Sequence, residues 1–273
     1  MRNFLDRIFM GYIFFIVIVA VVMWGMGGEM SSIILGVIIV LAVSLVIGLI
    51  IFVIAKIKNR GFMQFYREIY AIEDPLERIQ IIKDFKAQGR FKKLHESVYP
   101  NLLSVAYSEA CMYEEALKVI DENPPSPKSG EIGLYVWHYN KSLYCIKLGD
   151  VQQAREVFDK SEEIYQKWNG ASWQIKTQHQ LREVEVLLLE EKYDEARAAL
   201  NQYRQAINER TAENAPERLP ILYNEARLDI NNEQWGIARR KLDSILEDPN
   251  ATWALKHEAG LLLEFVLSKQ SEV

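Results

Sequence analysis

The sequence has little cysteine, glycine or proline. Its two cysteines, Cys111 and Cys145, cannot form the multiple disulfides of a small secreted scaffold. With 14 glycines and 8 prolines among 273 residues, the chain is neither collagenous nor of low complexity. Its net charge of −5 lacks the basic excess on which nucleic-acid binding depends. We therefore expect no nucleic-acid partner.

Motifs for catalysis and for metal binding are also missing. The four histidines are widely spaced and none belongs to an HExxH motif, and the two cysteines do not form a CxxC motif. We interpret both cysteines as small core residues. The sequence contains no glycine-rich phosphate loop and no GxSxG motif. Acidic pairs such as Glu190–Glu191 are typical of solvated helix surfaces. We therefore expect no enzymatic activity, no metal and no cofactor.

Charge is nearly absent from residues 1–55, which contain only four charged side chains. A helix needs about 20 apolar residues to cross a hydrocarbon core of about 30 Å. Two uncharged stretches, 8–26 and 32–55, come close to or exceed this length. They predict a hairpin of two transmembrane helices joined by a short, glycine-rich external loop at 27–31.

The basic residues beside the two stretches predict the orientation of the hairpin. Arg2 and Arg7 precede the first stretch, and Lys56, Lys58 and Arg60 follow the second. Basic residues next to membrane helices stay on the cytoplasmic side, so both termini are expected there, with two spans in the cell membrane. A cleaved signal peptide is the alternative for the first stretch. The apolar run of this stretch is longer than that of a typical signal peptide, and no small-x-small cleavage site follows it.

The second stretch carries small or branched side chains every four residues, at Gly36, Val40, Ser44 and Gly48. This spacing places them on one helix face, and small residues there let another helix approach closely. The face either packs on the first span or binds a membrane-protein segment of a partner.

After residue 60, apolar residues recur at helical spacing without strand alternation, and a short block repeats four times. Each block ends in an alanine, and successive alanines are 38, 42 and 42 residues apart. An alanine fits where two antiparallel helices approach most closely. In the second unit, Gly149 can end one helix in the left-handed conformation and Asp150 can cap the next. The blocks are Tyr113–Ala116, Val151–Ala154, Tyr193–Ala196 and Trp235–Ala238.

Over residues 70–268 the sequence resembles the tetratricopeptide-repeat (TPR) superfamily, with a period longer than the usual 34 residues. The matching residues are Leu103, Tyr107, Tyr113, Ala116, Gly149, Ala154, Phe158, Tyr193, Ala196, Ala226, Trp235, Ala238 and Pro249. The resemblance implies a right-handed superhelix of four to five helix pairs, closed by a capping helix at 251–268. Each unit of such a stack contacts only its neighbours.

The resemblance also implies that the first helix of each pair lines a groove that binds a peptide. The groove residues on this register are Asn101, Tyr139, Asn140, Arg182, Tyr223 and Arg227. Asn140 and Arg182 match positions that clamp a terminal carboxylate in some members of the family. Asn101 and Val105 do not match the remaining clamp positions. Each groove residue has the alternative of a purely structural role.

These observations predict an all-α protein: an N-terminal transmembrane hairpin, then a TPR-like solenoid with a C-terminal capping helix. The expected divisions are a tail at 1–7, spans at 8–26 and 32–55 around the loop at 27–31, a basic juxtamembrane linker or helix at 56–74, and the TPR-like domain at 75–273.

We expect a membrane-anchored scaffold on the cytoplasmic face, in a bacterial inner membrane by analogy, that captures a protein partner or peptide in its groove. Residues 56–93 carry a net charge of +5 and residues 94–273 a net charge of −10. An anionic inner leaflet would attract the basic segment next to the membrane and repel the acidic remainder. The alternative is that the basic residues only follow the rule that sets the topology or belong to ordinary helix surfaces. The alternative function is an accessory subunit of a transporter, translocase or envelope-synthesis complex that acts through the hairpin. Homo-oligomerisation stays open.

Overall fold

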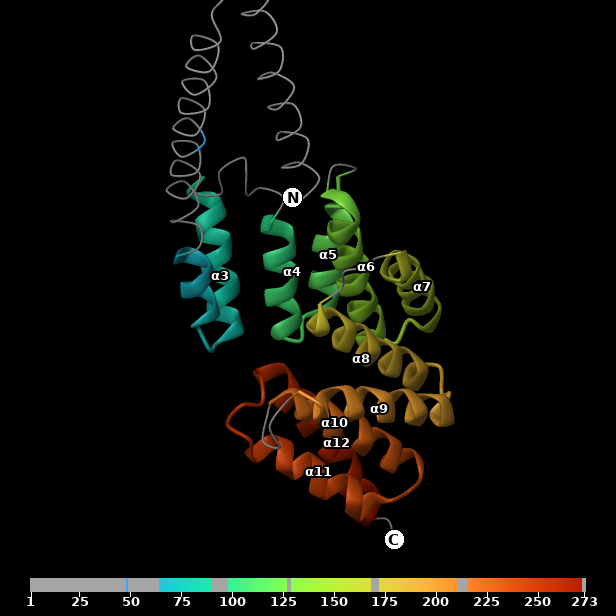
Figure 1. Ribbon diagram of the computed structural model, residues 1–273. Coiled ribbons are helices and arrows are strands. Elements are labelled where there is room, and N and C mark those ends of the chain that lie inside the picture. Colours follow the sequence, from blue (N-terminus) through green and yellow to red (C-terminus); the bar gives the residue numbers. More distant parts are fainter. Residues whose placement is uncertain are drawn as a thin grey trace, which may run out of the picture. The chain divides into compact units, whose positions relative to one another are not determined.

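The computed structural model describes residue 48 and residues 64–89, 98–126, 129–167, 172–210 and 216–271 (Figure 1). The chain divides into two compact units, Met1–Glu68 and Ile69–Val273. The predicted hairpin falls outside the described residues except for Gly48, which is helical and exposed. Among the helices of the described ranges, none combines the length and apolarity needed to cross a membrane.

The described part of the second unit is helical. Residues 69–70 end a helical stretch that starts at residue 64, and α3 begins five residues later. The elements are α3 (Pro75–Ala87), α4 (Tyr99–Glu109), α5 (Tyr113–Glu122), α6 (Gly130–Lys147), α7 (Val151–Lys167), α8 (Trp173–Leu189), α9 (Tyr193–Asn208), η3 (Pro216–Arg218), α10 (Leu219–Asn231), α11 (Trp235–Glu247) and α12 (Trp253–Ser271).

These helices pack as consecutive pairs. Helix α4 packs on α5, α6 on α7, α8 on α9 and α10 on α11, while α3 packs on α4 and α12 on α11 (Figure 1). The expected all-α architecture of stacked helix pairs is confirmed at this level. The first helices of the pairs also contact one another, α4 with α6, α6 with α8 and α8 with α10. We call these four helices the first-helix layer.

Polar side chains begin several of the helices. Asp74 caps α3, since its Oδ1 accepts a hydrogen bond from the Leu76 N–H at 2.8 Å, and Pro75 follows it as the first helical residue. Asp150 Oδ1 accepts from the Gln153 N–H at 2.9 Å. The predicted capping role of Asp150 at the start of α7 is therefore confirmed.

The four alanines of the repeated blocks are Ala116, Ala154, Ala196 and Ala238, and each is fully buried. Each lies in the first turn of the second helix of its pair. Larger side chains from both helices of the pair surround the last two alanines and form the apolar clusters of the third and fourth pairs. The alanines therefore mark the close contacts between paired helices, as their spacing predicted.

The turns between paired helices recur at a fixed position relative to the four alanines. Five residues before each alanine, one residue has positive φ: Cys111 (56°), Gly149 (75°), Glu191 (60°) and Glu233 (57°). The N–H that follows each of them bonds the carbonyl five residues earlier, at 2.9, 3.0, 2.9 and 2.8 Å in chain order. This is the Schellman motif that ends helices in the left-handed conformation. Four turns share one geometry, although only one of them has glycine.

Glu233→Gly should raise the free energy of unfolding. Relief of the left-handed conformation gives about 1–2 kcal/mol, and the greater freedom of glycine in the unfolded chain removes about 0.5–1 kcal/mol of it. We expect a net gain of about 0.5–1 kcal/mol in urea unfolding. Gly149→Ala is the reverse change in an equivalent turn and should lower stability. If both variants changed the free energy of unfolding in the same direction, the two turns would not share one left-handed geometry.

Candidate functional site

The predicted groove residues all lie in the first-helix layer. Asn101 is in α4, Tyr139 and Asn140 in α6, Arg182 in α8, and Tyr223 and Arg227 in α10. Because these helices contact one another in sequence, the six side chains come from one continuous layer. The residues differ in burial: Arg182 and Tyr223 are buried, with 4% and 9% of the whole residue exposed, and the others are half-buried.

Neighbouring helices of the layer are joined by pairs of these residues. Asn140 Nδ2 donates to Asn101 Oδ1 at 2.8 Å and so connects α6 with α4. The Tyr139 hydroxyl donates to the Gln178 carbonyl of α8 at 3.3 Å. The Arg182 guanidinium lies over the Tyr139 ring, 4.5 Å from its centroid. Predicted groove residues therefore bind one another across the helix contacts.

Arg182 forms the most buried ion pair of the layer. Its Nη1 donates to Glu185, one turn further along α8. Burial lowers the pKa of the guanidinium, but the interactions with Tyr139 and Glu185 raise it by more. Burial also raises the pKa of the Tyr139 hydroxyl. Arg182 Nε is buried without a hydrogen-bond partner among the described residues. The charge is thus balanced within α8, although not every donor is satisfied.

In α10, the polar side chains are held by the helix itself. Asn224 Nδ2 donates to the Pro220 carbonyl at 2.9 Å, and Arg227 Nη1 donates to Asn224 Oδ1 at 3.4 Å. Lys147 from the end of α6 lies over the Tyr223 ring, 5.5 Å from its centroid. Burial and the negative charge of Glu258 raise the pKa of Tyr223. Asn224 is almost completely buried.

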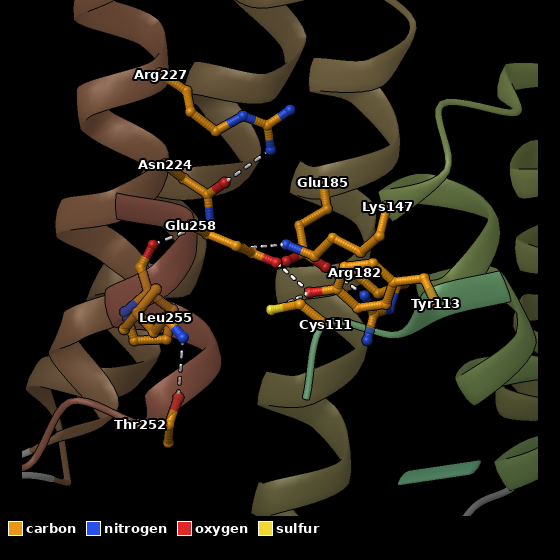
Figure 2. A network of polar contacts seen from close by, with 11 residues as sticks. Cys111, Tyr113, Lys147, Arg182, Glu185, Asn224, Arg227, Thr252, Leu255 and Glu258 are labelled. Atoms are coloured by element: carbon orange, nitrogen blue, oxygen red, sulfur yellow. Dashed lines mark hydrogen bonds and ion pairs between the residues drawn. The ribbon is translucent and has the colours of Figure 1, made fainter. Parts of the chain in front are cut away.

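The last helix, α12, reaches into this layer through Glu258. One carboxylate oxygen accepts from Lys147 Nζ at 2.6 Å, and the other accepts from the Tyr113 hydroxyl at the start of α5 (Figure 2). That hydroxyl is also 3.5 Å from Cys111 Sγ. Burial and the charge of Glu258 raise the pKa of Tyr113. Glu258 therefore connects the final helix to the first two helix pairs.

A cavity of about 220 Å³ lies beside this network. Its wall includes Lys147, Glu185, Tyr223, Asn224 and Glu258, from four different helices. Because the charged residues of the wall are paired with partners from the same chain, the cavity has no free charge of one sign to attract an ion. Glu258 of α12 therefore lies at this part of the layer, in one cavity wall with Glu185 of α8 and with Tyr223 and Asn224 of α10.

A larger groove of about 520 Å³ lies at the other end of the layer, between α4, the end of α5 and the start of α6. Its wall includes Asn101, Pro124, Pro125, Ile132 and Trp137. The Ile132 side chain is 57% exposed, and Trp137 is fixed because its indole Nε1 donates to the Ile120 carbonyl at 3.0 Å. Sequence reasoning identified only Asn101 of this set. The Pro-Pro pair was visible in the sequence, but the exposure of Ile132 was not.

Two further titratable groups, His179 and Cys145, have structural surroundings. His179 is buried between the rings of Phe158 and Tyr165 and pairs with Glu162. Cys145 is buried, as expected of a core residue, and burial raises the pKa of its thiol to about 11. Within the part of the chain that the structure describes, no group of three His, Cys, Asp or Glu residues could hold a metal ion.

The chain matches no protein-family model, no curated protein and no solved structure. Its function therefore has to follow from the geometry and chemistry of the chain itself.

Proposed function

We propose that this protein is a membrane-anchored interaction scaffold whose helical unit is a TPR-like solenoid that captures a segment of another protein. The buried alanine and the Schellman turn that recur every 38 to 42 residues support a true repeat. Stacked pairs of this kind present extended surfaces made from several helices. The uncharged stretches 8–26 and 32–55 support a membrane anchor with the helical unit on the cytoplasmic side.

The observation that carries the binding proposal is the open groove beside Asn101. It combines apolar walls from Ile132, Trp137 and the two prolines with the amide pair Asn101–Asn140 at 2.8 Å. Apolar pockets bury side chains of a partner, and amides hydrogen-bond to its backbone. Trp side chains are also enriched among the residues that dominate binding energy. The proposed ligand is an extended or helical peptide segment with at least one large apolar side chain.

Because Arg182 and Tyr223 are buried, the groove beside Asn101 is a better ligand site than the middle of the first-helix layer. A ligand that used Arg182 would have to replace both the Glu185 carboxylate and the Tyr139 ring as its partners. Breaking a buried pair costs several kcal/mol, which the new contacts would have to offset. A ligand that contacts Asn101 and Ile132 does not have to break a buried ion pair.

One observation supports a second function, that of an accessory subunit acting through the hairpin. Gly48 is exposed, and a methyl group added to its Cα would meet no atom within 4 Å. With Gly36 and Ser44, which lie outside the described residues, it would form a face for a membrane helix of a larger complex.

Ile132→Arg should reduce capture of the partner at least about tenfold, because it places a charge in the apolar wall of the groove. The measurement is the amount of each protein crosslinked to the full-length chain in native membranes, by quantitative mass spectrometry. Leu76→Arg is the matched control, since Leu76 is also 57% exposed but belongs to α3. Unchanged crosslinking by Ile132→Arg would overturn the groove proposal. Loss on Gly48→Leu instead would support the hairpin function.

A further inference from the structure

The carboxylate of Glu258 occupies a site that the first two helix pairs form. Lys147 Nζ, at the end of α6, donates to one oxygen at 2.6 Å, and the Tyr113 hydroxyl, at the start of α5, donates to the other (Figure 2). The side chains of Lys147 and Glu258 are only 16% and 14% exposed. Hydrogen bonds to a charged group are stronger than those between neutral groups, so these two donors form a specific carboxylate site. Neither donor is among the predicted groove residues.

The helix that carries Glu258 to this site has few buried residues of its own. Of the 19 residues of α12, only Ala259 and Val266 are buried, whereas seven of the 13 residues of α10 are. Segments with few buried apolar contacts open at a lower free energy than the rest of a protein. A displacement of about 1 Å already takes Glu258 out of hydrogen-bond distance of Lys147. The pair can therefore separate while the four helix pairs stay folded.

Without Glu258, this part of the first-helix layer would hold positive charge that no carboxylate balances. Lys147 would lose its anion. In α10, the Arg227 guanidinium donates to the neutral Oδ1 of Asn224 at 3.4 Å, and it forms no ion pair among the described residues. Glu185 cannot compensate, because it is already paired within α8. A mostly buried cation without a partner is costly, so another anion has to take the place of Glu258 when it leaves.

The cavity of about 220 Å³ has room for the residues that would bring such an anion. Its wall contains Lys147 and Glu258 together with three leucines, Leu181, Leu219 and Leu255. A carboxylate can thus reach Lys147 while an apolar side chain next to it packs against the leucines. Binding sites commonly combine an apolar wall with a few polar groups that fix the orientation of the ligand. The wall therefore fits an acidic side chain that has an apolar neighbour.

We propose that Glu258 is an internal ligand of this site, and that an acidic segment of another protein, with an apolar residue beside its carboxylate, binds to Lys147 and Tyr113 in its place. Helix α12 keeps the site closed until such a segment binds. The segment shifts the equilibrium because it binds only the open form. Its apparent affinity is reduced by the fraction of molecules in which the site is open. Since Lys147 is not in the wall of the groove beside Asn101, this proposal and the proposed function can fail separately.

The test measures binding of a fluorescent peptide, Gly-Leu-Glu-Leu-Gly with both ends blocked, to the full-length protein in detergent by fluorescence anisotropy. The same peptide with glutamine in place of glutamate is the control ligand. Glu258→Gln should lower the dissociation constant of the acidic peptide at least about tenfold, because it removes the internal carboxylate and leaves Lys147 without an anion. Glu264→Gln is the matched control, since Glu264 is exposed on the same helix, and it should leave the dissociation constant unchanged.

Two further variants show whether the tighter binding depends on the site itself. Adding Lys147→Met to Glu258→Gln should return the dissociation constant to the wild-type value or above it. Glu258→Asp keeps the charge but shortens the side chain by one methylene group, so it should give an intermediate value. If circular dichroism shows that Glu258→Gln has lost its helices, Glu258→Asp decides the question by the same comparison with the wild type. The proposal is wrong if the deciding variant binds the acidic peptide no more tightly than the wild type, if it binds both peptides equally, or if the gain survives Lys147→Met.

Discussion

Replacing Arg182 by leucine should lower the free energy of unfolding by about 3–5 kcal/mol, because it leaves the Glu185 carboxylate buried without its cation. The exposed fractions of the two side chains are only 5% and 12%. The Tyr139 ring also loses the guanidinium that lies over it. The measurement is urea unfolding of the purified protein, followed by far-UV circular dichroism.

The double variant Arg182→Leu with Glu185→Leu is the control for this prediction. Replacing a whole buried ion pair by apolar residues of similar volume is often neutral or stabilising, so most of the lost stability should return. If the double variant is as unstable as the single one, the cost comes from packing around Arg182 and not from the unpaired carboxylate.

Ala196→Leu should lower the free energy of unfolding by about 1–3 kcal/mol. Ala196 is fully buried in the cluster that α8 and α9 form with Leu200 and Leu188. Three additional carbon atoms there must displace these neighbours or force them from their preferred rotamers. Close packing leaves no free volume for them.

Ala198→Leu is the matched control, because Ala198 is exposed on the same helix two residues later. Leucine and alanine have similar helix propensities, so this change should alter stability by less than about 0.5 kcal/mol. The same urea experiment checks both variants. Equal stability of the two would mean that Ala196 does not lie at a tight helix contact.

The helix pairs were predictable because their signals are local. An alanine that recurs at a fixed spacing, with apolar residues before and after it, reports a close helix contact whatever surrounds it. The turns were predictable only in part. Gly149 indicates a left-handed residue, but Cys111, Glu191 and Glu233 adopt the same conformation without any such signal. In those three turns, the hydrogen bonds of the motif and the helices on either side offset the cost of a side chain.

The candidate site was less predictable, since its contacts join distant parts of the chain. Arg182 was predicted as a groove residue with a structural role as the alternative, and in the structure it pairs with Glu185. The spacing of three residues on one helix was visible in the sequence and favours this pair. No sequence pattern connects Glu258 with Lys147 and Tyr113. That contact depends on the rotation between successive helix pairs, added up over four pairs. No single repeat specifies this sum.

The contacts of Glu258 change how this stack should fold. In an open solenoid, each repeat touches only its neighbours, so folding can start anywhere and the ends can fray separately. Here Tyr113 and Lys147 are 145 and 111 residues away from the glutamate that binds them. Contacts of such long range are slow to form, because the intervening chain must first be ordered. Once made, they couple the first pairs to the last helix, so the unit should unfold in one cooperative step instead of repeat by repeat.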